Sequence, residues 1–147
     1  MSLIDNKRAT HDYTILEIIE VGLELLGPEV KSLRSGNGSL KGARVLVRGN
    51  EAYLIGATIP PWQVSNAPKS YNPERPRRLL LSRKEIDLIA GSETQAGLTT
   101  IPLSVYNKGR NLKLAIAIAK GKKDRDKRAS IKERDTKRDI DRTLKNR

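Results

Sequence analysis

The strongest constraint on the fold of this chain is an alternation of apolar and polar residues at a period of two. Between Tyr13 and Leu25 the odd positions are apolar except for Glu17. Successive side chains of a β-strand point to opposite faces, so this pattern favours strands with one buried face over helices. Gly22 interrupts this run and indicates a bulge or bend, which suits a strand curling around a small barrel.

Two hairpins are expected further along the chain. The clearest joins 101–105 to 112–118, where isoleucine, leucine and valine alternate with smaller or polar residues. Another joins 44–48 to 52–55 across Gly49-Asn50, a pair that tolerates positive φ and therefore suits a tight turn.

Two short helices and one long loop complete the expected elements. Residues 27–34 form a helix with Pro28 in its first turn and Gly36 beyond its end. Residues 82–91 begin with a capping box and continue with helical apolar spacing. The five prolines within 60–76 predict a surface loop. The fold class is therefore mainly β, a small closed or partly open antiparallel barrel with short flanking α-helices.

Charge divides the chain into two parts. Its 29 Lys and Arg against 17 Asp and Glu give a net charge of +12, which favours a polyanionic partner. Residues 120–147 hold 13 of the basic and 6 of the acidic residues, net +7, leaving 16 and 11, net +5, for the body. We expect a barrel domain at 1–123 and a basic tail at 124–147. No apolar run could span a membrane, and no membrane partner is expected.

The residue inventory argues against an enzyme. The chain has no cysteine and a single histidine, His11, which we interpret as a surface or packing residue. Gly36-Asn37-Gly38 and Lys120-Gly121-Lys122-Lys123 do not match the spacing of a nucleotide-binding loop. We expect no catalytic residue, cofactor or metal, and a cytoplasmic location because no targeting segment begins the sequence.

Clusters of basic residues indicate binding to RNA, although a merely soluble surface is the alternative. On a compact barrel several of them could form one phosphate-binding surface. With no Phe, one Trp and four Tyr to stack on bases, recognition by shape and backbone is favoured. The clusters are Lys7-Arg8, Lys31 with Arg34, Arg75 with Arg77-Arg78, Lys108 with Arg110, and Lys120 with Lys122-Lys123.

The tail holds too few apolar residues for a core, so we expect it to be disordered alone and helical on RNA. In a helix, Arg134, Arg138 and Arg142 would line one face, a like-charge row suited to phosphates. Ile140 and Leu144 would add a small apolar patch. A solubilising tail without a specific site is the alternative interpretation.

Several strings, in order and along nearly the whole chain, resemble the SmpB family. They are Asn6-Lys7-Arg8-Ala9, His11-Asp12-Tyr13, Glu29-Val30-Lys31-Ser32-Leu33-Arg34, Pro76-Arg77-Arg78-Leu79-Leu80-Leu81, Ala119-Lys120-Gly121-Lys122-Lys123, Asp126-Lys127-Arg128 and Ile131-Lys132-Glu133-Arg134. The sequence departs from the family pattern at Arg125, where His or Tyr is expected, and at Ala43-Arg44, where a Ser-Tyr-like pair is expected.

The resemblance implies an OB-like barrel that binds the tRNA-like domain of tmRNA and brings it to stalled ribosomes. Elongation factor Tu takes part indirectly, through aminoacylated tmRNA, and the tail enters the decoding centre and the empty mRNA channel. The tmRNA-binding residues expected in this way, together with the basic clusters, are Asn6, Lys7, Arg8, Glu29, Lys31, Arg34, Arg77, Arg78, Lys108, Arg110, Lys120, Gly121, Lys122 and Lys123. The tail residues expected to contact small-subunit rRNA are Arg125, Asp126, Lys127, Arg128, Ile131, Lys132, Arg134, Arg138, Arg142 and Leu144.

Two other classes of protein remain open on composition. An ordinary ribosomal protein or RNA chaperone with a basic tail would show the same charge. A nucleic-acid hydrolase would need carboxylates clustered in space to bind metal ions.

Overall fold

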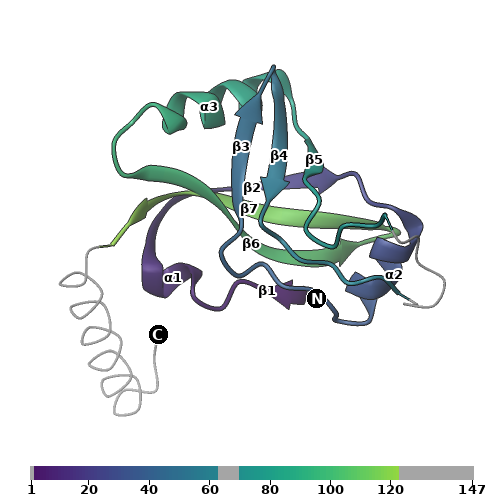
Figure 1. Ribbon diagram of the computed structural model, residues 1–147. Coiled ribbons are helices and arrows are strands. Elements are labelled where there is room, and N and C mark those ends of the chain that lie inside the picture. Colours follow the sequence, from purple (N-terminus) through teal and green to yellow (C-terminus); the bar gives the residue numbers. More distant parts are fainter. Residues whose placement is uncertain (1, 63–69, 123–147) are drawn as a thin grey trace, which may run out of the picture.

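The computed structural model describes residues 2–62 and 70–122 as one largely β unit (Figure 1). The predicted tail at 124–147, with its expected order and contacts, lies outside the described residues. The elements are β1 (Ser2–Asp5), α1 (Ala9–Asp12), β2 (Tyr13–Leu23), α2 (Gly27–Arg34), β3 (Arg44–Arg48), β4 (Glu51–Ile55), β5 (Arg77–Leu80), α3 (Arg83–Glu93), β6 (Leu98–Lys108) and β7 (Asn111–Gly121).

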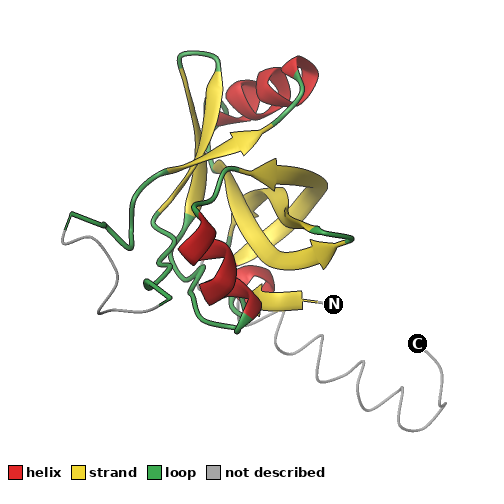
Figure 2. Ribbon diagram, turned by 90° about the vertical axis from the view of Figure 1, so that its right-hand side faces the viewer, coloured by secondary structure: helices red, strands yellow, loops and turns green. Residues whose placement is uncertain are grey.

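The strands form a ring in which all pairs are antiparallel. The order around the ring is β6-β3-β4-β5-β2-β7, and the last strand, β7, pairs with the first, β6. β1 lies outside the ring and pairs with β6. The β3–β6 contact that closes the ring rests on one register pair, Val45 opposite Thr100. The expected OB-like class is confirmed in its antiparallel ring and short helices, but the ring is less regular than a clean barrel. In Figures 1 and 2 α3 lies in the upper half of the molecule beside the β3–β4 hairpin, and α1 and α2 lie in the lower half.

A bulge in β2 divides the single buried face predicted for the odd positions from Tyr13 onwards, and it lies elsewhere than expected. The register against β7 shifts between Ile15 and Glu17, whereas Gly22 pairs regularly with both β5 and β7. The prediction of a bulge at Gly22 was therefore wrong. The extra residue exchanges the two faces of the strand. Ile15 thus packs outside the ring with alanines of β7, Ile19 packs against the main core, and Ile18 is 61% exposed.

The predicted helices are confirmed. α2 has a proline in its first turn, and Gly36 follows its end with a φ of +79°. In α3 the capping box is formed as predicted, because Ser82 Oγ accepts from the Glu85 amide at 3.2 Å and Glu85 Oε1 accepts from the Ser82 amide at 3.0 Å. The helix runs two residues past its predicted end at Gly91, to Glu93, and there buried Ser92 donates its hydroxyl to the Ile89 carbonyl at 2.7 Å.

The remaining expectations concern the turns and short strands. Gly49 and Asn50 both have positive φ, +58° and +67°, as the predicted tight hairpin requires. The described parts of the 60–76 segment form no strand before β5. Three elements of four residues each, β1, α1 and β5, were not predicted, because so short an element shows no periodicity of its own.

A buried hydroxyl at the closing pair predicts a stabilising substitution. Thr100 is 1% exposed, and its Oγ1 has no hydrogen-bond partner among the described residues. Thr100→Val keeps the shape and removes an unsatisfied polar atom, so we expect the free energy of unfolding to rise by about 1 kcal/mol. Urea unfolding of this variant, with Thr14→Val at an exposed position of β2 as the control, measures the effect. A loss of stability in Thr100→Val alone would contradict the prediction.

Candidate nucleic-acid interface

The predicted basic residues gather at the two ends of the β6–β7 hairpin rather than on one surface. Lys108 and Arg110 lie at its turn, and Lys120 and Gly121 lie at its other end, all exposed. The first and last residues of β7, Asn111 and Gly121, are ten residues apart, which is at most about 33 Å along the strand at roughly 3.3 Å per residue. We call them the turn-end surface and the junction surface.

The turn-end surface contains a groove of about 340 Å³. Residues from β2, α2, β5 and β7 form it, with apolar side chains between cationic ones. The lining residues are Gly22, Leu23, Leu25, Val30, Arg34, Leu80, Arg110, Asn111, Leu112 and Lys113. Such a groove can hold a polyanionic backbone on its cations and cover a sugar or base edge with its apolar residues.

Specific contacts hold the cations of this groove in place. Arg34 Nη2 donates to the Arg110 carbonyl at 2.8 Å and joins α2 to the hairpin turn. Gly22 lies between two residues of this groove, since a Cβ there would make ordinary contacts with Leu80 at 3.4 Å and with Lys113 Nζ at 3.7 Å. Lys31, one helical turn before Arg34, is exposed on α2. The predicted Lys31, Arg34, Lys108 and Arg110 thus lie at one end of the molecule.

A polar cluster around Glu20 borders the same end. Lys108 Nζ donates to Glu20 Oε1 at 2.8 Å, and the Tyr106 hydroxyl donates to Glu20 Oε2. The hydrogen bonds from Lys108 and Tyr106 lower the pKa of Glu20. Burial, reinforced by the contact with Glu20, raises the pKa of Tyr106 to about 12. No local pattern indicates this cluster, because Glu20 has the spacing of a solvated strand position and Lys108 is 88 residues away.

The junction surface joins the N-terminal segment to the end of β7. Asn6 Nδ2 donates to the Pro102 carbonyl at 2.9 Å, so its side chain anchors the segment on β6. Lys7 is exposed, and Arg8 is 3.5 Å from Asp12. Lys122 Nζ donates to the Thr10 carbonyl at 3.0 Å, and Lys123 lies outside the described residues.

Glu29 and Arg77 lie where no RNA could touch them in this structure. Both side chains are 0% exposed and form an ion pair at 2.7 Å. Arg75 and Tyr71 also bind the Glu29 carboxylate. The expectation that Glu29 and Arg77 contact RNA directly therefore needs correction, because any effect on binding must pass through the residues that they hold. This burial is a tertiary property that no local pattern reveals.

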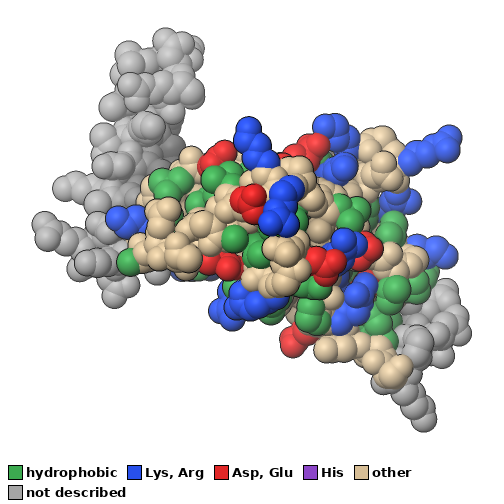
Figure 3. Space-filling view, turned by 90° about the horizontal axis from the view of Figure 1, so that it is seen from above, with side chains coloured by type: hydrophobic (Ala, Val, Ile, Leu, Met, Phe, Trp, Pro, Cys, Tyr) green, Lys and Arg blue, Asp and Glu red, His purple; other side chains and the backbone are tan. Residues whose placement is uncertain are grey.

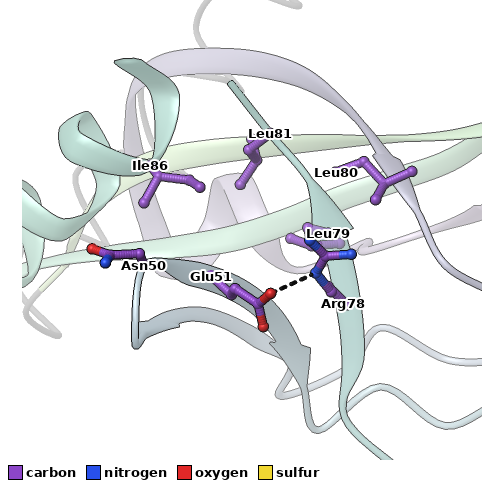
Figure 4. Close-up of a pocket in the computed structure, with 7 residues that line it drawn as sticks. All are labelled: Asn50, Glu51, Arg78, Leu79, Leu80, Leu81 and Ile86. Carbon is purple, nitrogen blue, oxygen red and sulfur yellow. Dashed lines mark ion pairs between the residues drawn. The ribbon is translucent and has the colours of Figure 1, made fainter. Parts of the chain in front are cut away.

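Arg78 is exposed but engaged in two ion pairs. Its guanidinium lies 3.3 Å from Glu24 and 3.2 Å from Glu51. Figure 4 shows it on the rim of a second groove, between β5 and the start of α3. With two carboxylates beside one guanidinium, this groove is less suited to phosphate than the turn-end groove. The face of the molecule seen in Figure 3 likewise mixes basic and acidic side chains.

Residues 2–62 and 70–122 were also compared with the requirements of a metal site and of a membrane-spanning helix. No group of three or more His, Asp or Glu side chains could hold a metal ion there. None of the helices in these ranges is long and apolar enough to cross a membrane.

An antiparallel ring with a cation-rimmed groove defines a small nucleic-acid-binding protein of the OB-like class. The sequence profile of the SmpB protein family matches residues 3–146, and the chain belongs to this family.

Relatives and a solved structure agree with this assignment. The SsrA-binding protein of Roseiflexus sp. is 46% identical over 143 residues, which are 97% of this chain and 90% of the relative. That of Clostridium acetobutylicum is 42% identical over 145 residues, covering 99% and 93%. A solved structure described as "tmRNA-SmpB: a journey to the center of the bacterial ribosome" contains a chain with a TM-score of 0.68 and 39% identity, covering 82% of this chain and 84% of that one.

The Glu29 cluster predicts a specific acid sensitivity. Burial alone would raise the pKa of Glu29, but hydrogen bonds from Arg75, the Leu26 amide and Arg77 outweigh it and lower the pKa from 4.5 to about 2. A depressed folded-state pKa stabilises the fold above the unfolded value and ceases to do so as pH falls from 4.5 towards 2. At 1.36 kcal/mol per pKa unit the loss is about 3 kcal/mol.

Urea unfolding between pH 5 and 2 tests this expectation. Glu29→Gln should flatten the pH dependence of stability in this window, while Glu74→Gln, an exposed carboxylate of the neighbouring loop, should leave it unchanged. Parallel pH profiles for Glu29→Gln and the unmodified protein would contradict the assigned pKa.

Proposed function

We propose that this protein binds the tRNA-like domain of tmRNA through its turn-end surface and delivers it to stalled ribosomes for trans-translation. The groove rimmed by Arg34, Arg110 and Lys113 is the observation that carries the proposal. The relatives of this protein are named SsrA-binding proteins, which supports tmRNA as the RNA that it binds.

The chemistry of the surface suits a folded RNA. Cations spaced around an apolar groove neutralise phosphates, and a rigid ring presents them in a fixed arrangement that can match an RNA shape. None of the described residues that line the groove is aromatic. Shape and backbone recognition therefore fit better than stacking along a single strand.

We assign the tail a separate role in this function. Residues 124–147 would contact small-subunit rRNA in the decoding centre and the empty mRNA channel, through the tail residues named from the sequence. Elongation factor Tu would meet the complex through the aminoacylated RNA. The protein would act in the cytoplasm as a binding and delivery factor that makes no covalent bond. Its junction surface, with Lys7, Arg8 and Lys120, lies where this tail begins.

A general ribosomal protein or RNA chaperone is the competing function, and truncation separates the two. We would measure binding of the full chain and of residues 1–123 to the tRNA-like domain of tmRNA, with ordinary tRNA as competitor at physiological salt. The proposal expects a preference for the tRNA-like domain that survives truncation. Equal binding of both RNAs, or loss of most affinity with the tail, would support the chaperone instead.

Lys113 provides a test of the turn-end surface itself. Lys113→Ala should weaken binding and lower the slope of log affinity against log salt by about 0.8, the value for one lost phosphate contact. Lys84→Ala, which removes one exposed charge on α3, is the matched control and should leave both quantities unchanged. Equal effects of the two substitutions would show that only overall charge matters.

A further inference from the structure

The buried carboxylate of Glu29 receives hydrogen bonds from three parts of the chain. Within α2, the Leu26 amide donates to Glu29 Oε1 at 2.8 Å. From β5, Arg77 Nε and Nη2 donate to Oε2 at 3.1 and 2.7 Å. From the segment before β5, the Tyr71 hydroxyl and Arg75 Nε each donate to Oε2 at 3.0 Å.

The partners of Glu29 also form hydrogen bonds with backbone carbonyls. Arg77 Nη1 donates to the Ala57 carbonyl at 2.9 Å, and its Nη2 donates to the Pro73 carbonyl at 2.8 Å. The Tyr71 hydroxyl lies 2.8 Å from the Ile59 carbonyl and 3.0 Å from Glu29 Oε2, so its one proton is shared between these two acceptors. The carboxylate and its partners therefore connect α2 and β5 with Ala57, Ile59 and Pro73.

Such a cluster is a poor way to gain stability alone. Removing two charges from water costs several kcal/mol per ion, and well-packed apolar residues in place of a buried ion pair often stabilise a fold as well or better. A fully hydrogen-bonded buried network instead defines a geometry, because each hydrogen bond is strong only over a narrow range of directions. The question is which geometry depends on Glu29.

The two elements that Glu29 joins both contribute residues to the turn-end groove. Val30 and Arg34 line it from α2, and they follow Glu29 by one and five residues. Leu80 lines it from β5, the strand that begins at Arg77. The carboxylate thus lies behind the groove and sets the distance between its α2 wall and its β5 wall.

We propose that Glu29 is a positioning residue for RNA binding, which holds the α2 and β5 walls of the turn-end groove at the separation that the RNA requires. It does so without touching the RNA. The inference rests on the proposed function and assigns Glu29 a role that its burial otherwise leaves unexplained. Misplacing a supporting group by about 1 Å is enough to weaken a preformed site.

Glu29→Gln is the first test, because it keeps the size of the side chain and removes its charge. We expect binding to the tRNA-like domain to weaken by about tenfold or more at a temperature where the variant is fully folded. Glu74→Gln, on the exposed side of the same loop, is the control and should bind as the unmodified protein does. Unchanged affinity of a folded but less stable Glu29→Gln would overturn the proposal, because the role would then be structural alone.

A double-mutant cycle tests the route of the effect. If Glu29 acts through the α2 wall, Glu29→Gln should cost less affinity in an Arg34→Ala background than in the unmodified protein. Additive losses would overturn the proposed route. Should Glu29→Gln fail to fold, Tyr71→Phe removes one donor to the carboxylate and should show the same coupling to Arg34 in milder form, whereas full additivity there would equally count against it.

The outcomes separate this inference from the proposed function. If the unmodified protein shows no preference for the tRNA-like domain over ordinary tRNA, the proposed function fails and with it the inference. If the preference is present and Arg34→Ala weakens it while Glu29→Gln does not, only the positioning role fails.

Discussion

The pairing of β6 with β7 is the interaction on which the rest of the structure depends. Ten register pairs join the two strands, and each also pairs with other strands: β7 with β2, and β6 with β1 and β3. β7 itself is regular. In its pairings with β2 and β6 there is one register shift each, near Leu16 in β2 and near Leu103 in β6, and in both cases the extra residue belongs to the partner strand. Bulges increase local bending. The two partners can therefore curve away from β7 and meet the remaining strands of the ring.

Two kinds of interaction then shape the binding surface on this frame. Inside, the Glu29 carboxylate holds α2 and β5, whose outer residues form the walls of the groove. Outside, Glu20 orients Lys108 beside the hairpin turn. In both places a carboxylate on a strongly basic protein keeps arginines or a lysine in position. A carboxylate near a polyanion-binding surface thus holds the cationic side chains in place while it lowers the net positive charge of the surface only slightly.

Patterns of local sequence predicted what depends on local physics. The long strands follow from period-two alternation, α2 from Pro28 and Gly36, and α3 from the Ser82–Glu85 capping box. The predicted bulge at Gly22 failed because a glycine in a strand does not by itself fix a bulge, and here Gly22 pairs regularly with both β5 and β7. Contacts over 48 or 88 residues, such as Glu29 with Arg77 and Glu20 with Lys108, carry no local signature. Four-residue strands fail for the same reason, since their pairing partners alone define them.

The length of the hairpin also matters for function. The turn-end groove and the point where the chain leaves β7 towards residue 123 lie at opposite ends of an 11-residue strand. An RNA held in the groove is therefore separated from the last residue of β7 by up to about 33 Å of strand at roughly 3.3 Å per residue. Two ligands can then be bound without competing for one set of cations. Because β7 is paired on both sides along its length, this separation is fixed by the fold rather than by a flexible linker. A rigid spacing of this kind is what a delivery factor with two RNA contacts requires, whereas a general RNA chaperone has no use for it.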